Sequence, residues 1–237
     1  MYIVIAGGGI AGSTLAAELV NRKHDVVVID RDREACEDVY GDTGAVAVHG
    51  SATDVAVLKQ AGLHKAQVAV GAMYRDTDNL TFALLARSFG VPRLVMKMRD
   101  PAYADAYRVA GVDAVCNMIE MFRHRVVAEI ENPHIRVLTR LEGSDAHLVM
   151  FRFPGSGGGA GTRIRDLAVD PAFARDCVFA GILKSEEQTI VMPRGEDQVV
   201  PGDTIFAVVK PRHLGEISAF LERFGPATEP DLDGGTA

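Results

Sequence analysis

The residues best suited to chemistry stand near the start of the chain, in the run Gly7-Gly8-Gly9-Ile10-Ala11-Gly12. This GxGxxG motif follows a short apolar run and opens a segment of helical period. In such a turn the first glycine permits a tight bend, the second lets the backbone approach a pyrophosphate, and the third lets helix and strand pack closely. The N–H groups around Ile10 and Ala11 would face phosphates at the positive end of that helix. The motif therefore predicts a nucleotide-binding turn.

A carboxylate follows at the spacing that such a site needs. Asp30 ends the second predicted strand, eighteen residues after Gly12, where an acid accepts hydrogen bonds from the adenosine ribose. Asp30 would repel a 2′-phosphate, which favours NAD(H), ATP or ADP over NADP(H). Arg31 lies beside it and could weaken that preference. Asp30 could instead only cap the next helix, but its spacing from the glycines favours the ribose.

Three further strand ends should open onto the same crevice. Ser51-Ala52 follows the third strand and is expected to edge the adenine, while Thr53 or Asp54 could cap the next helix. Ala72-Met73 follows the fourth strand and should pass over the ribose-phosphate. Lys97 and Arg99 are two apart at the end of the fifth strand, hence on one side of it, and either could meet a phosphate. Each could also be a solvated charge.

The sequence offers little that points to catalysis. Seven histidines are present, and none stands in a pattern typical of a nucleophile's partner or a metal site, so we predict neither. A small NAD-dependent oxidoreductase is the alternative, with His49 or Tyr74 as its proton-transfer group. A third hypothesis keeps the fold as a dimerising scaffold with an empty crevice.

The elements that must position these residues alternate along the first 116 residues. Strand-like runs are expected at 2–6, 25–30, 45–48, 68–71, 94–97 and 114–116, with helical segments at 12–22, 54–61, 78–89 and 101–110. Near-continuous apolar strands that alternate with helices indicate parallel pairing covered on both faces. We therefore predict an α/β fold, an N-terminal Rossmann domain with a doubly wound parallel sheet.

The second half is β-rich and follows one more helix. A helix is expected at 119–131, and Asn132-Pro133 should end it. Strands are expected at 136–140, 147–153, 177–184, 189–192 and 204–209, with a turn at Val200–Asp203 and a last helix at 212–224. This pattern predicts a nucleotide-binding domain at 1–133, a small α+β domain at 134–225 and a disordered tail at 226–237. The glycine-rich run 155–161 is expected to be a mobile loop.

Composition excludes several classes of protein. The chain has 237 residues, 48% of them apolar, and a formal net charge of −7. Its basic residues form no block, so nucleic acid is an unsuitable partner. Three separated cysteines indicate reduced cytosolic thiols. No stretch reaches the roughly 20 apolar residues of a membrane-spanning helix.

Several segments together resemble a known family. Tyr2–Gly12, Val28–Asp32 and His49–Asp54, continued by Asp76–Asn79 and Arg99–Ala104, resemble the TrkA-N (RCK, or KTN) domain. In the second half, Pro193-Arg194-Gly195 and Val200–Ile205 are similar to the TrkA-C (RCK-C) domain. The resemblance covers roughly residues 1–224 and matches two domains in order.

The resemblance implies a function and partners. It implies a cytoplasmic regulatory subunit that is not an enzyme and that gates a membrane-embedded potassium channel or transporter of the Trk type, at the inner face of the cell membrane. It implies NAD(H) or an adenine nucleotide (ATP or ADP) as ligand, carried over onto Gly7, Gly9, Gly12 and Asp30. It also implies homodimers and rings of dimers.

A dimer is expected on physical grounds as well. The predicted helix 119–131 holds more apolar surface than a linker needs. These apolar residues could also pack on their own domain. They are Ile119, Phe122, Val126, Val127 and Ile130.

Overall fold

Two compact units make up the chain. The computed structural model describes residues 1–141, 143–155 and 161–223. The units are Met1–Phe122 and Arg123–Ala237, and the division falls inside helix α6 (Met118–Glu131), before the predicted boundary at 133. Within the second unit, Arg125 of α6 donates a hydrogen bond to the Val137 carbonyl oxygen at 3.1 Å. The expected tail, 226–237, and residues 156–160 of the expected glycine-rich loop lie outside the described residues.

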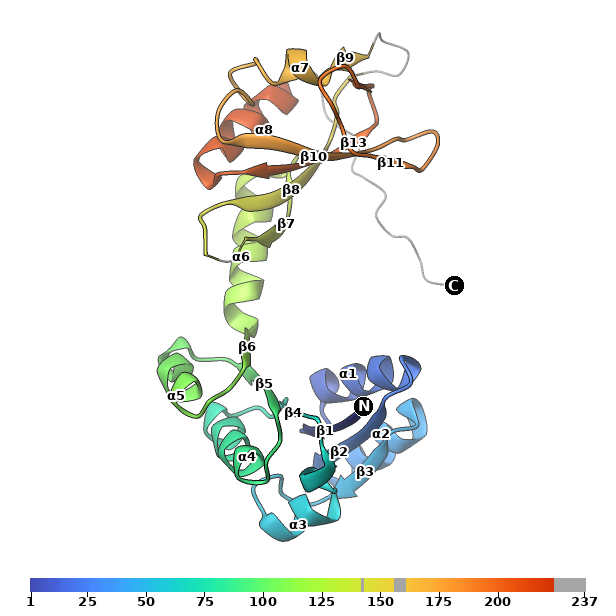
Figure 1. Cartoon of the computed structure of the whole chain (residues 1–237), viewed down its shortest axis with the longest axis vertical. Helices are drawn as coiled ribbons and strands as arrows, with labels where there is room; N and C mark the ends of the chain where they lie inside the picture. Colours follow the sequence, from blue (N-terminus) through green and yellow to red (C-terminus); the bar gives the residue numbers. More distant parts are fainter. Residues whose placement is uncertain (142, 156–160, 224–237) are drawn as a thin grey trace. The chain divides into compact units, whose positions relative to one another are not determined.

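The first unit is built on a six-stranded parallel sheet of order β3-β2-β1-β4-β5-β6 (Figure 1). This is the strand order of a doubly wound dinucleotide-binding fold, so the predicted Rossmann architecture is confirmed. The strands are β1 (Tyr2–Ala6), β2 (Asp25–Asp30), β3 (Val46–His49), β4 (Val68–Gly71), β5 (Arg93–Met98) and β6 (Ala114–Asn117).

Helices cover both faces of this sheet because its central strands β1 and β2 are apolar on both sides. Ile3 and Ile5 of β1 pack on one face in a cluster with Ala16 of α1. On the other face Val4 lies in a cluster with Phe82 of α4. The helices are α1 (Ile10–Asn21), α2 (Arg33–Thr43), α3 (Val55–Gln60), α4 (Asp76–Ser88) and α5 (Ala104–Val109), with 3-10 turns η1 (Leu63–Lys65) and η2 (Pro101–Tyr103).

The second unit is a five-stranded antiparallel sheet of order β11-β10-β13-β8-β7, with a separate β9-β12 pair. It confirms the expected small α+β domain. Its strands are β7 (Arg136–Arg140), β8 (His147–Arg152), β9 (Thr162–Arg163), β10 (Cys177–Leu183), β11 (Ile190–Val191), β12 (Gln198–Val199) and β13 (Thr204–Val209). Its helices are α7 (Ile164–Leu167) and α8 (Leu214–Glu222), and a 3-10 turn, η3 (Pro211–His213), precedes α8.

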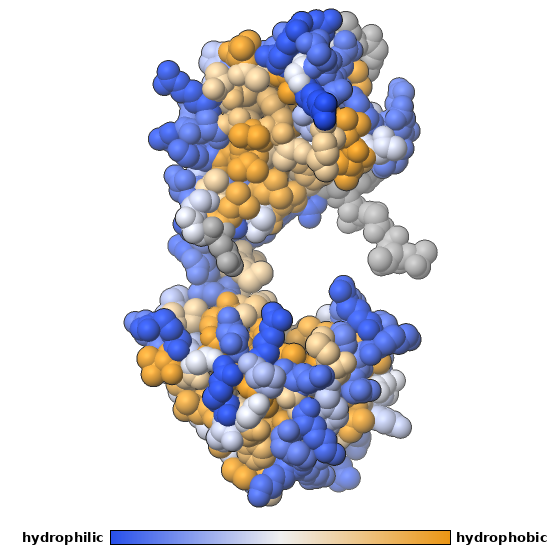
Figure 2. All heavy atoms as spheres, in the orientation of Figure 1, coloured by the Kyte–Doolittle hydropathy of each residue, from blue (hydrophilic) through white to orange (hydrophobic). Residues whose placement is uncertain are grey.

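One face of this sheet carries the core of the second unit. Phe173 stands at its centre, 5.9 Å from the ring of Phe151 and 4.9 Å, edge-on, from that of Phe220. Large apolar side chains elsewhere on the unit are exposed, among them Val178 and Met192, and Figure 2 shows an apolar patch on the side in view.

Within the described ranges, no helix combines the length and the apolar composition needed to span a bilayer.

Candidate functional site

A cleft of about 1180 Å³ opens at the carboxyl ends of β1 and β4, the two central strands of the first sheet. The strand order reverses between these two strands, and open α/β sheets bind ligands at such a switch point. The glycine turn, Asp30 and Lys97 all line this cleft.

The glycines of the turn serve different purposes. Gly7 has φ +105°, and a Cβ there would stand 3.0 Å from the backbone nitrogen of Met73. At Gly12 a Cβ would stand 1.8 Å from the carbonyl oxygen of Gly7, so no side chain fits between helix α1 and this turn. At Gly9, by contrast, a Cβ would meet nothing within 4 Å. Gly9 therefore leaves space that a phosphate can occupy.

The start of helix α1 can bind an anion. Gly9 is its N-cap residue, and no side chain of the described chain caps it. The first N–H groups of a helix lack intrahelical acceptors and carry the positive end of its dipole. Ile10 and Ala11 line the cleft. Their N–H groups can therefore receive a pyrophosphate.

Asp30 joins the glycine turn to the end of β2. Its Oδ2 accepts a hydrogen bond from the Gly8 backbone nitrogen at 2.5 Å, and its Oδ1 accepts one from the Asp32 nitrogen at 2.9 Å. These bonds fix the carboxylate in the cleft wall. Since each carboxylate oxygen accepts more than one hydrogen bond, Asp30 can still accept from ribose hydroxyls.

Arg31 and Ser51 meet beside Asp30. The Arg31 Nη2 donates to the Ser51 Oγ at 3.1 Å, and Ser51 Oγ lies 2.8 Å from Thr53 Oγ1. Arg31 and Ala52 line the cleft. Ser51 is not part of the lining and holds Arg31 through the hydrogen bond to its guanidinium group. His49, the candidate proton-transfer group, places its Nε2 3.0 Å from the Arg31 carbonyl oxygen.

Lys97 brings a positive charge to the β4–β5 side of the cleft. Its Nζ donates to the Ala72 carbonyl oxygen at 2.8 Å. Burial lowers the pKa of Lys97, and the neighbouring Arg99 lowers it further. Ala72 and Met73 line the same wall. Two further donors of the ammonium group are left for a phosphate.

Arg99 does not line the cleft as Lys97 does. Its guanidinium carbon stands 4.0 Å from the ring centre of Tyr74, a cation–π contact. Tyr74 lines the cleft, so Arg99 contacts the cleft wall through the ring of Tyr74. Gly8 and Gly12, like Ser51, support the cleft wall without being part of its lining.

The structure brings in residues that the sequence did not indicate. Thr14 and Glu18 of α1 line the cleft, as do Cys116 of β6 and Met118 at the start of α6. Only topology places β6 beside β5, so no local pattern could have found Cys116 and Met118, whereas Thr14 and Glu18 follow Ile10 at helical spacing along α1. The cleft thus extends from Asp30 past the switch point to Cys116, which leaves room for both halves of a dinucleotide.

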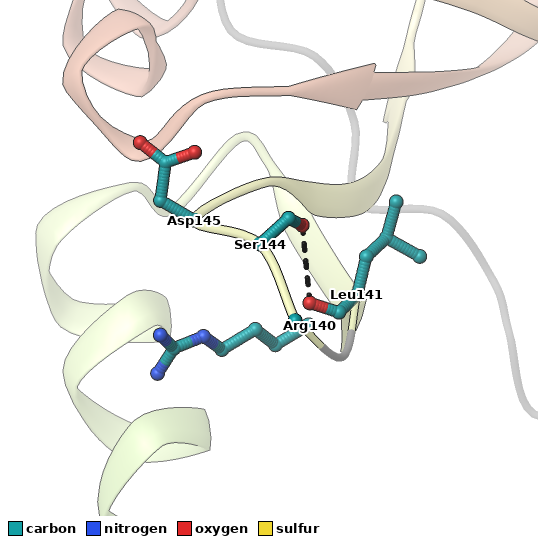
Figure 3. Close-up of a pocket in the computed structure, with 5 residues that line it drawn as sticks. Arg140, Leu141, Ser144 and Asp145 are labelled. Atoms are coloured by element: carbon teal, nitrogen blue, oxygen red, sulfur yellow. Dashed lines mark hydrogen bonds between the residues drawn. The ribbon is translucent and has the colours of Figure 1, made fainter.

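A second hollow, of about 550 Å³, lies in the turn between β7 and β8 (Figure 3). Its lining comes from Arg140, Leu141, Gly143, Ser144 and Asp145. The Ser144 hydroxyl donates to the Leu141 carbonyl oxygen at 3.1 Å, a bond within the turn itself. The side chains of Arg140 and Asp145 point apart, so this hollow does not gather polar groups around a ligand.

Comparison with protein families identifies the first unit. The model of the TrkA-N domain matches residues 3–118. The Trk system potassium uptake protein TrkA homolog of Methanothermobacter thermautotrophicus is 27% identical over 196 residues, which cover 82% of this chain and 90% of the relative. The Trk system potassium uptake protein TrkA of Mycobacterium tuberculosis is 26% identical over 230 residues, which cover 93% of this chain and 98% of the relative.

Solved structures share the fold. The GsuK channel matches with a TM-score of 0.64 at 20% identity, over 96% of this chain and 40% of the channel chain. The GsuK channel bound to NAD matches with a TM-score of 0.59 at 19% identity, over 97% of this chain and 40% of the channel chain. This chain therefore spans less than half the length of those channel chains.

Proposed function

Because residues 3–118 are a TrkA-N domain and the chain is a relative of the TrkA potassium uptake proteins, we propose that it is a nucleotide-sensing regulatory subunit of a potassium transport system. Its partner is a membrane-embedded potassium transporter or channel, which it meets from the cytoplasmic side. Its role is regulatory and not enzymatic.

The observation that carries this proposal is the contrast within the glycine turn. Gly12 has no room for a side chain because Gly7 packs against it, whereas Gly9 has open space at the start of α1. Packing alone explains Gly7 and Gly12, but it gives no reason for open space at Gly9. A phosphate bound at the uncapped helix end gives that reason.

The ligand is NAD(H), with ATP and ADP as the competing adenine nucleotides. The adenosine half lies against Asp30, the pyrophosphate at the start of α1, and the second half beyond the switch point between Lys97 and Cys116. The NAD-bound state of the GsuK channel, which shares the fold, supports this choice. If different nucleotides favour different arrangements of the subunit, they put the transport partner into opposing states.

We propose further that the subunit is a homodimer joined through α6, and that such dimers assemble into rings. Ile119, Phe122, Val126 and Ile130 follow a helical spacing along α6, and all four are exposed, Phe122 by 68% and Ile130 by 75%. An apolar stripe of this kind is stabilised by burial against a partner.

The test is calorimetric titration of the purified chain with NADH, NAD, ATP and ADP, beside Asp30→Ala and a control, Asp105→Ala. Asp105 is an exposed acid on α5 that pairs with Arg108. We expect micromolar binding that Asp30→Ala weakens at least about tenfold and the control leaves unchanged. Steady oxidation or reduction of the dinucleotide with a metabolite would favour the oxidoreductase alternative, in which Tyr74, exposed in the cleft, is the candidate proton-transfer group.

A further inference from the structure

Three buried polar side chains lie behind the cleft, between the ends of β4 and β5. Asp76 and Asn79 come from α4 and Tyr107 from α5, with exposed fractions of 8%, 1% and 0%. We call these three residues the polar clasp. Burying polar groups is costly unless they are hydrogen-bonded, so the partners of the clasp show what it holds.

Asn79 joins the segment after β4 to the end of β5. Its Oδ1 accepts a hydrogen bond from the Met73 nitrogen at 3.1 Å, and its Nδ2 donates to the carbonyl oxygens of Met73 and Lys97, each at 3.1 Å. All three partners are backbone atoms. The amide therefore fixes the course of two chain segments.

Tyr107 and Asp76 extend this link to the segment after β5. The Tyr107 hydroxyl lies 3.1 Å from Asp76 Oδ1 and 3.3 Å from the Lys97 carbonyl oxygen. Asp76 accepts hydrogen bonds from the backbone nitrogens of Arg99 at 3.1 Å and Asp100 at 3.0 Å. Burial and the Asp76 carboxylate raise the pKa of Tyr107, so its hydroxyl stays a donor at neutral pH.

The clasped segments form one wall of the cleft. Lys97 reaches the Ala72 carbonyl oxygen at 2.8 Å, and the Met73 nitrogen lies 3.0 Å from where a Cβ at Gly7 would stand. The clasp thus fixes backbone that touches the glycine turn and backbone that carries Lys97. The clasp residues themselves are not part of the described cleft lining.

We propose, on the basis of the proposed nucleotide-binding function, that Asp76, Asn79 and Tyr107 are positioning residues for the half of the nucleotide that lies beyond the switch point. The adenosine half rests on Asp30 and the β1–β2 side, whose hydrogen bonds do not involve the clasp. Disturbing the clasp therefore weakens a dinucleotide and spares AMP. A residue that only stabilised the fold would not separate the two ligands.

The test uses Tyr107→Phe and, as a second variant, Asn79→Ser, which adds no charge. Tyr103→Phe is the matched control, because Tyr103 is half-buried nearby and its hydroxyl lies outside the clasp. Affinities for NADH and AMP are measured by calorimetry for the whole chain. Loss of a buried hydrogen bond predicts NADH binding weakened about tenfold, with AMP within about twofold and both unchanged in the control.

Each other result overturns the proposal. An equal loss for NADH and AMP would assign the clasp to fold stability alone, and unchanged NADH affinity in both variants would remove its effect on the site. A wild-type chain that binds NADH but not AMP would show that the two halves do not bind separately. A wild-type chain that binds neither ligand would instead remove the proposed function, and the clasp proposal with it.

Discussion

The carbonyl oxygen of Gly7 occupies the space that a side chain at Gly12 would need: a Cβ at Gly12 would stand 1.8 Å from it. The oxygen belongs to the backbone of the turn and cannot swing aside as a flexible side chain could. Helix α1 and the turn before it are therefore packed as closely as two backbones allow.

Gly12→Ala is expected to destabilise the chain. The added methyl group must push α1 away from the turn, at a cost of about 1 to 3 kcal/mol or more. Urea unfolding measures this loss of stability, with Gly41→Ala in α2 as the control. A Cβ at Gly41 would meet nothing within 4 Å, so that change should be neutral or stabilise by up to about 1 kcal/mol. Equal stability of Gly12→Ala and wild type would contradict the close packing.

Gly9→Ala should separate binding from folding. The backbone at Gly9 has φ −65°, which alanine adopts freely, and a Cβ there has open space. The variant should unfold within about 1 kcal/mol of wild type. Its methyl group fills the approach to the start of α1, so NADH affinity by calorimetry should fall at least about tenfold. Undiminished affinity would place the phosphates elsewhere.

Asp203 should make the second unit sensitive to acid. Burial acts to raise the pKa of its carboxyl, but hydrogen bonds from Lys184 and from the Val200 and Ser185 nitrogens outweigh it and lower the pKa below 3.8. Because the folded pKa is the lower one, this stabilisation is present above pH 3.8 and is lost as pH falls through the folded value.

Asp203→Asn is expected to cost about 2 to 4 kcal/mol at pH 6, since it breaks a buried ion pair whose acid is 1% exposed. The difference from wild type should shrink below pH 3.8. Urea unfolding between pH 6 and pH 3 measures both, with exposed Asp166→Asn as the control. A difference that stays constant across this range would show that the Asp203 charge has no part in stability.

Phe122→Glu should shift the proposed homodimer to monomer. A carboxylate in the exposed stripe of α6 would be buried without a partner on association. Light scattering on size-exclusion fractions should show twice the chain mass for wild type and one chain mass for the variant. Leu84→Glu is the control, because Leu84 is an exposed apolar residue on α4. A wild-type chain of single mass would contradict the proposed dimer.

Much of the fold could be predicted because buried parallel strands consist of continuous runs of apolar residues. The bounds of β1, β2, β4, β7 and β13 agree with those expected, and those of the other expected strands differ by one residue at one or both ends. A helix after Asp30 was expected, but the bounds of α2 were not predicted, since its residues are mostly polar and only Cys36 and Val39 are buried. The pair β9 and β12 was missed because two-residue strands show no period.

The site was predictable where it is local in sequence. The glycine turn and Asp30 stand at a spacing that one crossover helix fixes. In the polar clasp, Asn79 and Tyr107 both meet the Lys97 carbonyl oxygen, and this proximity depends on strand order and on which face a helix covers. Charge alone made Lys97 and Arg99 equivalent, whereas in the structure Lys97 lines the cleft and Arg99 lies over the ring of Tyr74.

The open space at Gly9 also has an evolutionary meaning. Gly7 and Gly12 are held by the architecture itself, so replacing either costs stability in any descendant that keeps this fold. On the proposed function, Gly9 is held only by its ligand. A lineage that ceased to bind nucleotide would be free to replace Gly9 while its neighbours stayed fixed, and that substitution would mark the loss in the sequence.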